Sequence, residues 1–367
     1  MSTRAIVQLI RALMTGETGK NEDMHKTGRI VFNTSVLGAS HIKDDKPCQD
    51  YSIAWQSEDP DAVVLVVCDG HGSDTYVRSD VGSRLAGEIT LQAVQAFFPK
   101  DGKDLDLDWI IGTKGDVTAR EVDESLRYSD VPSKDESEMT ESEVLRFKQR
   151  LEFIEQIKGL HEQDAIFQAL FSSIYEKWLD AISKDAEQNP FSENELSKLG
   201  NHKLVKAYGT TLMTYVQTSH YWFAFHIGDG RMLASFDGAE WRQIVPWDCS
   251  CFQNQTTSLC NSYPLPYFRY AFDGTGNFPI AIICCSDGIE DSYGDYEVAP
   301  ERLQGYFAGL TKVFVEEGKE STMARLEEFL PKLSSVGSKD DMSLAGLIDV
   351  DAYIAIKEQE DVTENQE

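Results

Sequence analysis

The sequence has 367 residues, of which 41% are hydrophobic, and it carries 18 Phe, 14 Tyr and 6 Trp. This size and aromatic content predict one large folded domain or two ordinary ones rather than a disordered chain. The formal net charge of −28 disfavours nucleic acid and anionic membrane surfaces as partners, because both would be repelled. An anionic substrate would need a local positive charge, which a bound metal cation supplies.

The cysteine pattern indicates a reducing compartment. The seven cysteines form no spaced disulfide framework, and several lie inside apolar runs, so we expect a cytoplasmic protein. A zinc cluster of Cys249, Cys251 and Cys260 is disfavoured, because these residues include no Cys-x-x-Cys pair and have no nearby His. No stretch of about 18 apolar residues is present, so no membrane span is predicted.

Residues 1–28 are expected to form an N-terminal extension. The stretch AIVQLIRALM is interrupted by polar residues and lacks a cleavage-site pattern, so a signal peptide is not predicted. Its apolar positions share one helical face and predict a short amphipathic helix: Ile6, Leu9, Ile10, Leu13 and Met14. We expect this helix to dock on its own domain rather than on a partner, with residues 15–28 as a polar linker.

Strands and a helix are predicted over residues 29–98. The run AVVLVVC at 62–68 is β-branched, short and continuous, which predicts a strand covered on both faces. Residues 75–98 have helical spacing and end before Pro99. Residues 101–143 then carry fourteen acids against five bases, and this composition predicts a partly mobile surface insertion.

The remainder again predicts helices and strands. Helical spacing over 144–178 is followed by strands within 208–236, which are separated by tight turns. Residues 246–278 are irregular and rich in Asn, Gln, Pro and aromatics, which predicts a flap-like loop.

The last third predicts a buried strand, two helices and a final strand, at 279–285, 297–317, 321–333 and 337–350. Residues 355–367 form an acidic tail that we expect to be disordered. Hairpin-spaced strands dominate the whole pattern, which favours an antiparallel α+β fold over a doubly wound parallel sheet.

Isolated acids stand at the ends of these strands. They occur in five short motifs: Gln49-Asp50, Asp69-Gly70, Gly228-Asp229-Gly230, Ser286-Asp287-Gly288 and Asp340-Asp341. One Asp-Gly after a strand is usually a turn, but several indicate carboxylates gathered at a sheet edge. Their repulsion is costly unless cations lie between them. Mg²⁺ and Mn²⁺ take oxygen ligands and keep several waters, so they suit such a sparse cluster.

The same motifs resemble those of the metal-dependent protein phosphatases of the 2C type, in order and in rough spacing. They are DGHG at 69–72, GTT at 209–211, GDGR at 228–231, SDG at 286–288 and GSKDDMS at 337–343. The upstream PCQD at 47–50 is similar to the first acidic motif of the bacterial branch. The resemblance implies a phosphatase domain over 29–354 with a four-layer αββα sandwich, in which helix pairs flank two antiparallel sheets.

Metal-binding roles follow from the resemblance. Asp69 would bridge two Mg²⁺ or Mn²⁺ ions, and Gly70 would offer its backbone carbonyl. Asp50 would hold metal directly or through water. Asp287 and Asp340 would bind the second ion.

Three further residues match the motifs of the family. Asp341 takes the place of a neighbouring Asn or Asp, and Asp229 matches an acid linked to a weaker third metal ion. His71 matches the proposed general acid, which would protonate the leaving serine or threonine oxygen. The resemblance implies a phosphoserine or phosphothreonine protein as substrate, and we expect a monomer.

One departure concerns substrate binding. Many members have an arginine that grips the phosphate before the first acidic motif, but the loop HIKDDKPCQD has none. Lys43, Lys46 or His41 could replace it, although a lysine cannot reproduce the bidentate fork of an arginine. The lysines are equally well explained as solvated loop charges. Arg231, which follows the GDG motif, is expected to form a structural ion pair.

Two other functions stay open on the sequence alone. The missing arginine is compatible with a pseudophosphatase scaffold that binds a partner or phosphopeptide without turnover, whereas the presence of Asp69, Asp287 and Asp340 argues against it. A metallohydrolase that acts on small phosphate esters or nucleotides is the third candidate.

Overall fold

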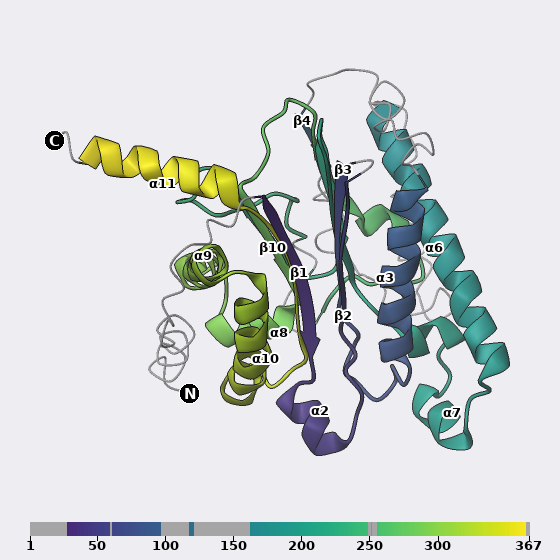
Figure 1. Cartoon of the computed structure of the whole chain (residues 1–367). Coiled ribbons are helices and arrows are strands. Elements are labelled where there is room, and N and C mark those ends of the chain that lie inside the picture. The colour runs from purple at the N-terminus through teal and green to yellow at the C-terminus, as the bar shows by residue number, and fades with distance from the viewer. Residues whose placement is uncertain are drawn as a thin grey trace.

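Two β-sheets packed face to face form the centre of the molecule, with helices on both outer faces (Figure 1). The computed structural model describes residues 28–58, 61–96, 117–120, 162–248, 251 and 255–364. The first sheet has the strand order β1 (Arg29–Val36), β11 (Met342–Asp349), β10 (Ala281–Cys285), β7 (Arg231–Ser235) and β8 (Arg242–Gln243).

The second sheet has the order β2 (Tyr51–Glu58), β3 (Asp61–Cys68), β5 (Leu212–Thr218), β6 (Trp222–Ile227), β9 (Arg269–Asp273) and β4 (Val117–Arg120). Every pair of neighbouring strands in the two sheets is antiparallel.

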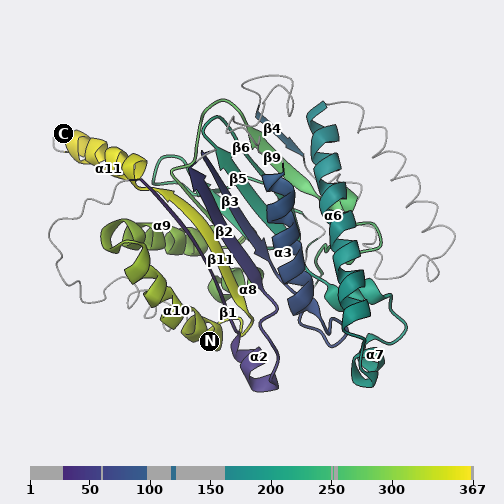
Figure 2. The same ribbon diagram turned by 45° about the vertical axis from the view of Figure 1, so that its right-hand side comes forward.

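A pair of long helices covers each sheet, as Figure 2 shows from a second direction. α3 (Ser79–Gln95) and α6 (Glu162–Gln188) lie on the second sheet, and α9 (Pro300–Glu317) and α10 (Lys319–Val336) lie on the first. The shorter elements are α2 (Ala39–Asp44), α7 (Glu193–Leu199), η3 (Leu204–Tyr208), η4 (Leu265–Tyr267), α8 (Asp287–Tyr293) and α11 (Val350–Glu364). The predicted α+β class and the four-layer order are confirmed.

Strand β3 explains why the apolar runs of this sequence are continuous. Its residues Val63, Leu65 and Val67 pack between the two sheets, whereas Val64 and Val66 belong to the core under α3 and α6. Successive side chains of a strand point to opposite faces, so a strand covered on both sides is apolar at every position. The prediction for residues 62–68 is therefore confirmed.

Two predicted segments were wrong. The expected loop 246–278 contains strand β9, whose residues Tyr270, Ala271 and Phe272 are buried and pair with β6. The apolar part of β9 is only three residues long and is flanked by Arg269 and Asp273, so the sequence pattern does not indicate a strand there. The expected disordered tail 355–367 is helical as far as Glu364, because α11 continues through it.

Two other predictions lie mostly outside the described residues. Of the acidic insertion 101–143, the structure describes residues 117–120, which form β4 and pair with β9. The N-terminal helix and linker, residues 1–27, are not among the described residues.

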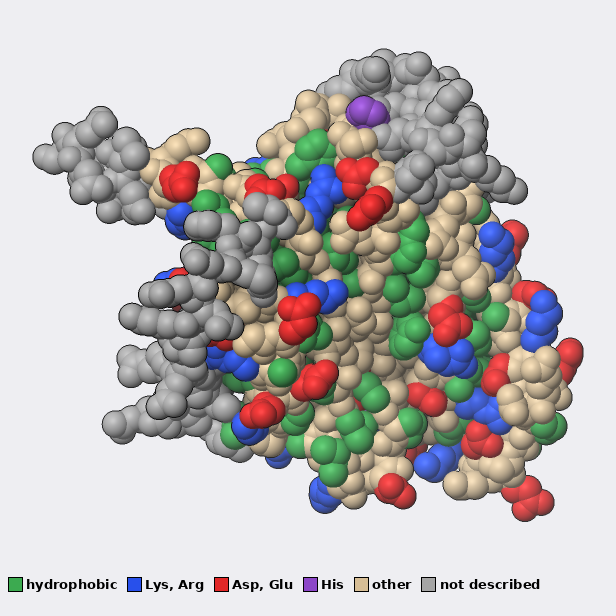
Figure 3. Space-filling view, in the orientation of Figure 1, with side chains coloured by type: hydrophobic (Ala, Val, Ile, Leu, Met, Phe, Trp, Pro, Cys, Tyr) green, Lys and Arg blue, Asp and Glu red, His purple; other side chains and the backbone are tan. Residues whose placement is uncertain are grey.

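The described residues show no membrane-spanning helix and a mixed surface charge. None of the helices in the described ranges is both long and apolar enough to span a bilayer. On the described surface drawn in Figure 3, Lys and Arg side chains are interspersed with Asp and Glu and form no continuous basic patch.

Candidate active site

Strand register brings the predicted acids to one edge of the sandwich. In the second sheet, Tyr51 at the start of β2 pairs with Cys68 at the end of β3. Asp50 comes directly before Tyr51, and Asp69 comes directly after Cys68. Both acids therefore lie at the same edge of the second sheet.

The first sheet contributes the other acids in the same way. Cys285, the last residue of β10, pairs with Leu344 of β11 and with Arg231 of β7. Asp287 follows β10, the Asp340-Asp341 pair precedes β11, and Asp229 precedes β7. The two antiparallel pairings therefore place these acids at one edge of the first sheet.

Side-chain contacts join the two edges. Ser286 Oγ, from the first sheet, donates a hydrogen bond of 2.7 Å to Asp50 Oδ2, from the second. The carboxyl groups of Asp69 and Asp287 lie close enough that the charge of Asp287 helps to raise the pKa of Asp69. Residues more than 200 positions apart in sequence thus meet at one place.

Burial and mutual repulsion raise the pKa values of these acids. Burial is the main cause for Asp69, followed by the charge of Asp287. Burial and then the charge of Asp341 raise the pKa of Asp50. The pKa of Asp287 reaches about 8 and that of Asp229 about 6, in both cases mainly through burial. The site therefore has a strongly negative potential that favours either protons or bound cations.

The donor set fits hard divalent cations. The carboxylate oxygens at this edge are ligands that Mg²⁺ and Mn²⁺ prefer, and these ions keep several waters in a sparse site. Within the described ranges, no three His, Cys, Asp or Glu side chains are already arranged as a closed set of metal ligands. The acids instead meet pairwise, so an ion bound here would complete its coordination with water.

Asp341 has a different position from its neighbour. Asp340 is exposed at the edge, and its pKa is raised mainly by desolvation. Asp341 is buried, and its carboxylate accepts hydrogen bonds from Gly38 N (2.6 Å), Gln49 N (2.6 Å) and His41 Nδ1 (2.8 Å). It therefore ties down both ends of the loop that leads to Asp50. The sequence alone did not predict this role.

Two glycines of the acidic motifs allow backbone segments to approach closely. A Cβ on Gly70 would lie 2.4 Å from the carbonyl oxygen of Gln49, and a Cβ on Gly288 would lie 2.0 Å from that of Asp341. No side chain fits at either position, because real Cβ contacts are longer than 3.0 Å. The glycines thus bring the segments that carry Asp69 and Asp287 against those that carry Asp50 and Asp340.

The GTT motif fixes the turn that carries Asp69. The carbonyl of Asp69 accepts hydrogen bonds from Thr211 N (2.8 Å) and Thr210 Oγ1 (3.0 Å), and its amide donates to Thr211 Oγ1 (3.0 Å). The isolated bridge between Gly70 and Thr210 continues this pairing. The motif therefore has a positioning role.

His71 follows Asp69 and Gly70 in the chain, at the start of the loop after β3. Its amide donates to Gly209 O at 3.2 Å, and its ring meets the Tyr76 ring edge-on with centroids 4.7 Å apart. A Cβ on Gly209 would lie 2.6 Å from His71 Cδ2, so this glycine makes room for the imidazole. Burial and then the charge of Lys206 lower the pKa of His71 to about 3, so the ring is neutral near pH 7.

The three candidates for binding substrate phosphate lie in different environments. His41 is buried, and its Nδ1 is engaged by Asp341. Lys43 is exposed on α2. Lys46 Nζ donates a hydrogen bond of 2.9 Å to Gly72 O, so this ammonium group reaches the loop that contains His71. Lys46 is therefore the lysine beside the site.

Arg231 forms the structural ion pair that was predicted. Its Nε lies 2.8 Å from Glu290 Oε2, and its guanidinium stacks 3.5 Å from the centroid of the Trp247 ring. Of the three cysteines considered as a zinc cluster, Cys251 donates to Gly228 O, and Cys260 accepts from Ser258 Oγ. Cys249 lies outside the described residues.

Similar structures include several bacterial phosphatases. The serine/threonine phosphatase Stp1 from Staphylococcus aureus is 11% identical, with 90% of this chain and 98% of that chain covered and a TM-score of 0.45. PstP from Mycobacterium tuberculosis is 14% identical, with coverages of 88% and 99% and a TM-score of 0.42. PppA from Pseudomonas aeruginosa is 12% identical, with coverages of 88% and 98% and a TM-score of 0.45.

Comparison with curated proteins gave no match. The sequence model of the family described as protein phosphatase 2C, however, matches residues 37–331, which include the strand-edge acids up to Asp287. The chain therefore belongs to the protein phosphatase 2C family.

Proposed function

We propose that this protein is a metal-dependent serine/threonine phosphoprotein phosphatase. The observation that carries the proposal is the meeting of Asp50, Asp69 and Asp287 at one edge of the sandwich, where burial and their mutual repulsion raise their pKa values. Such a cluster is unfavourable by itself, and divalent cations would relieve the repulsion. Membership of the protein phosphatase 2C family supports this activity over a scaffold function.

Two Mg²⁺ or Mn²⁺ ions would be held by Asp50, Asp69, Asp287, Asp340 and the backbone carbonyl of Gly70. Asp229 would hold a weaker third ion. When bound, such ions lower the pKa of a coordinated water and shield the phosphoryl oxygens from the attacking nucleophile.

The protein residues around these acids have separate tasks. Ser286 orients Asp50 through the 2.7 Å hydrogen bond, and Thr210 and Thr211 fix the backbone of Asp69. Asp341 holds the loop that leads to Asp50, since its carboxylate accepts from Gly38, Gln49 and His41, and it would not itself hold an ion. These contacts would keep the acids in place, as a metal site requires.

His71 would protonate the leaving serine or threonine oxygen. Its place two residues after Asp69 in the chain supports this role. The ring is neutral in the substrate-free protein, but the negative charge of a phosphate monoester beside it would favour the imidazolium form. Lys46, which contacts Gly72 in the same loop, would attract the same phosphate as a point charge rather than a bidentate fork.

The test is phosphate release from a phosphoserine peptide in the presence of Mn²⁺. We expect activity that EDTA abolishes and that Asp287→Asn lowers by at least about 10²-fold, since this residue would hold metal. The matched control is Asp180→Asn, because Asp180 is an exposed acid on α6 with 64% of its side chain accessible. Turnover that is indifferent to both EDTA and Asp287→Asn would refute the proposal.

A further inference from the structure

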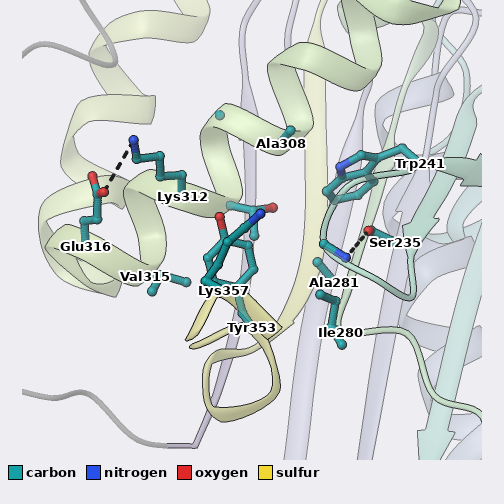
Figure 4. A pocket seen from close by; sticks show the side chains of 13 residues that line it. Ser235, Trp241, Ile280, Ala281, Ala308, Lys312, Val315, Glu316, Tyr353 and Lys357 are labelled. Carbon is teal, nitrogen blue, oxygen red and sulfur yellow. Dashed lines mark hydrogen bonds and ion pairs between the residues drawn. The ribbon is translucent and has the colours of Figure 1, made fainter. Parts of the chain in front are cut away.

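A groove lies beside the first residues of β10, whereas the acids lie beyond its last residue. Ile280 and Ala281 are at the start of this strand, whereas Asp287 follows its end. The groove has a volume of about 610 Å³. Figure 4 shows its lining, with Lys312 and Val315 from α9 on one side, Trp241 and Ile280 on the other, and Tyr353 from α11 between them.

The walls of the groove suit an apolar helix. Trp241, Ile280 and Ala281 supply an apolar floor, and Ala308 and Val315 lie seven residues apart on one face of α9. Residues at such spacing share a helix face, so the groove runs along α9. A helix that binds in a groove of this type inserts apolar side chains at positions i, i+3, i+4 and i+7.

The chain supplies a segment with this pattern. Ile6, Leu9, Ile10 and Leu13 have the required spacing, and the opposite face contains Arg4, Gln8 and Arg11. The first fourteen residues contain no acid, whereas the whole chain has a net charge of −28. Long-range attraction therefore favours contact of this segment with the rest of the protein.

The attachment point of this segment lies beside the groove. Gly28 N donates to Asp351 Oδ2 at 2.9 Å, and Val350 N donates to Gly28 O at 3.0 Å. Gly28 is thus held on the first turn of α11, the helix that also supplies Tyr353 to the groove. Residues 15–27 can span up to roughly 40 Å when extended, so the apolar residues of the segment reach the groove. The tether also provides a high effective concentration, which makes weak contacts sufficient.

We propose that residues 4–14 dock as an amphipathic helix in the groove between α9 and α11. Ile6, Leu9, Ile10 and Leu13 would contact Trp241, Ile280 and Val315. The segment would thereby join the N-terminus to the C-terminal helix on the side of the first sheet away from the acidic cluster.

The experiment uses the full chain with the photoreactive residue p-benzoylphenylalanine in place of Lys312. This lysine lines the rim of the groove and has 61% of its side chain exposed. After irradiation and proteolysis, mass spectrometry is expected to find cross-links within one chain between position 312 and residues 4–14. The same label at Lys184 on α6, which is 63% exposed, should give no such cross-link.

A matched pair of variants tests the helix face. Leu9→Asp should reduce the cross-link from position 312 about tenfold, the equivalent of about 1.4 kcal/mol, whereas Gln8→Asp, with the same added charge on the opposite face, should leave it unchanged. Cross-links only between two chains would show that a second copy occupies the groove. That result, or a cross-link that is insensitive to Leu9→Asp, would overturn the proposal.

Discussion

His41 Nδ1 lies 2.8 Å from Asp341 Oδ2, and both side chains are buried. An ionised carboxylate can only accept, so Nδ1 donates. The hydrogen bond and the charge of Asp341 raise the pKa of His41 above its ordinary value of 6.5. The same carboxylate accepts the amides of Gly38 and Gln49. Asp341 is therefore the residue that holds the loop between β1 and Asp50.

Replacing Asp341 should lower stability more than replacing its neighbour. Asp341→Asn removes the charge and turns an acceptor into a donor that faces backbone amides, so we expect a loss of about 2–4 kcal/mol. Urea unfolding in EDTA measures this loss. Asp340→Asn, which changes an exposed side chain, should cost less than about 1 kcal/mol under the same conditions. Equal losses for the two variants would contradict the assigned role of Asp341.

Removal of one buried charge should stabilise the metal-free protein. The folded-state pKa of Asp287 is about 8, against an ordinary value of 3.8. Between these values the folded state binds more protons than the unfolded state, so this group makes stability fall as pH rises. In EDTA at pH 8, Asp287→Asn should therefore be more stable than the parent protein, by at least about 1 kcal/mol.

The difference in stability between Asp287→Asn and the parent protein should narrow towards pH 5, where Asp287 is protonated in the folded parent protein. Thermal unfolding with and without Mn²⁺ completes the test, because the parent protein should gain stability from the ion and the variant should gain little. A variant that is less stable than the parent at pH 8 in EDTA would show that repulsion does not dominate this site.

A methyl group at Gly288 should disturb both stability and the site. Its Cβ would lie 2.0 Å from Asp341 O, so Gly288→Ala must displace backbone, at a cost of about 1–3 kcal/mol or more. Gly305→Ala on α9 is the control, because no atom lies within 4 Å of the added Cβ. This control should raise stability by about 0.5–1 kcal/mol. Denaturant unfolding measures the change in the free energy of unfolding for both variants. If the close approach at Gly288 matters, this change is negative for Gly288→Ala and positive for Gly305→Ala.

The contact of Lys46 with Gly72 predicts an effect on substrate binding. Lys46→Ala should raise KM for a phosphopeptide about three- to tenfold, which corresponds to roughly 0.6–1.4 kcal/mol. Lys43→Ala, on the exposed face of α2, should leave KM unchanged although it removes the same charge. Steady-state kinetics at fixed ionic strength distinguishes a local contact from a general effect of net charge. Similar KM values for both variants would contradict a role of Lys46 in phosphate binding.

The role of His71 can be tested through the leaving group. A general acid matters most when the departing oxygen is a poor leaving group, as in phosphoserine. His71→Asn should therefore lower turnover of a phosphoserine peptide by about 10²-fold and that of p-nitrophenyl phosphate far less. A uniform loss on both substrates would instead indicate that His71 positions the acidic loop.

Much of the fold and of the acidic site could be predicted from the sequence. Asp69 and Asp287 each follow an uninterrupted apolar strand, and antiparallel pairing of adjacent strands then brings their ends to one edge. The role of Asp341 could not be predicted, because its partner His41 is 300 residues away in the sequence. The sequence also does not indicate which of the two adjacent acids, Asp340 or Asp341, is buried.

Two errors have a local cause. Strand β9 is five residues long, and only three apolar residues stand between Arg269 and Asp273, so its periodicity is too short to recognise. Helix α11 was assigned to a disordered tail because of its acidic composition. Asp349 is nevertheless a residue that favours the start of a helix. Its Oδ1 accepts a hydrogen bond of 2.9 Å from Ala352 N and so caps α11.

The most direct test of the proposed metal site is anomalous diffraction at the manganese edge from crystals soaked in Mn²⁺. We predict strong anomalous peaks at the strand edge between Asp50, Asp69, Asp287 and Asp340, and their loss after a soak in EDTA. Absence of density at this edge, or peaks only at other acidic surfaces, would contradict the account.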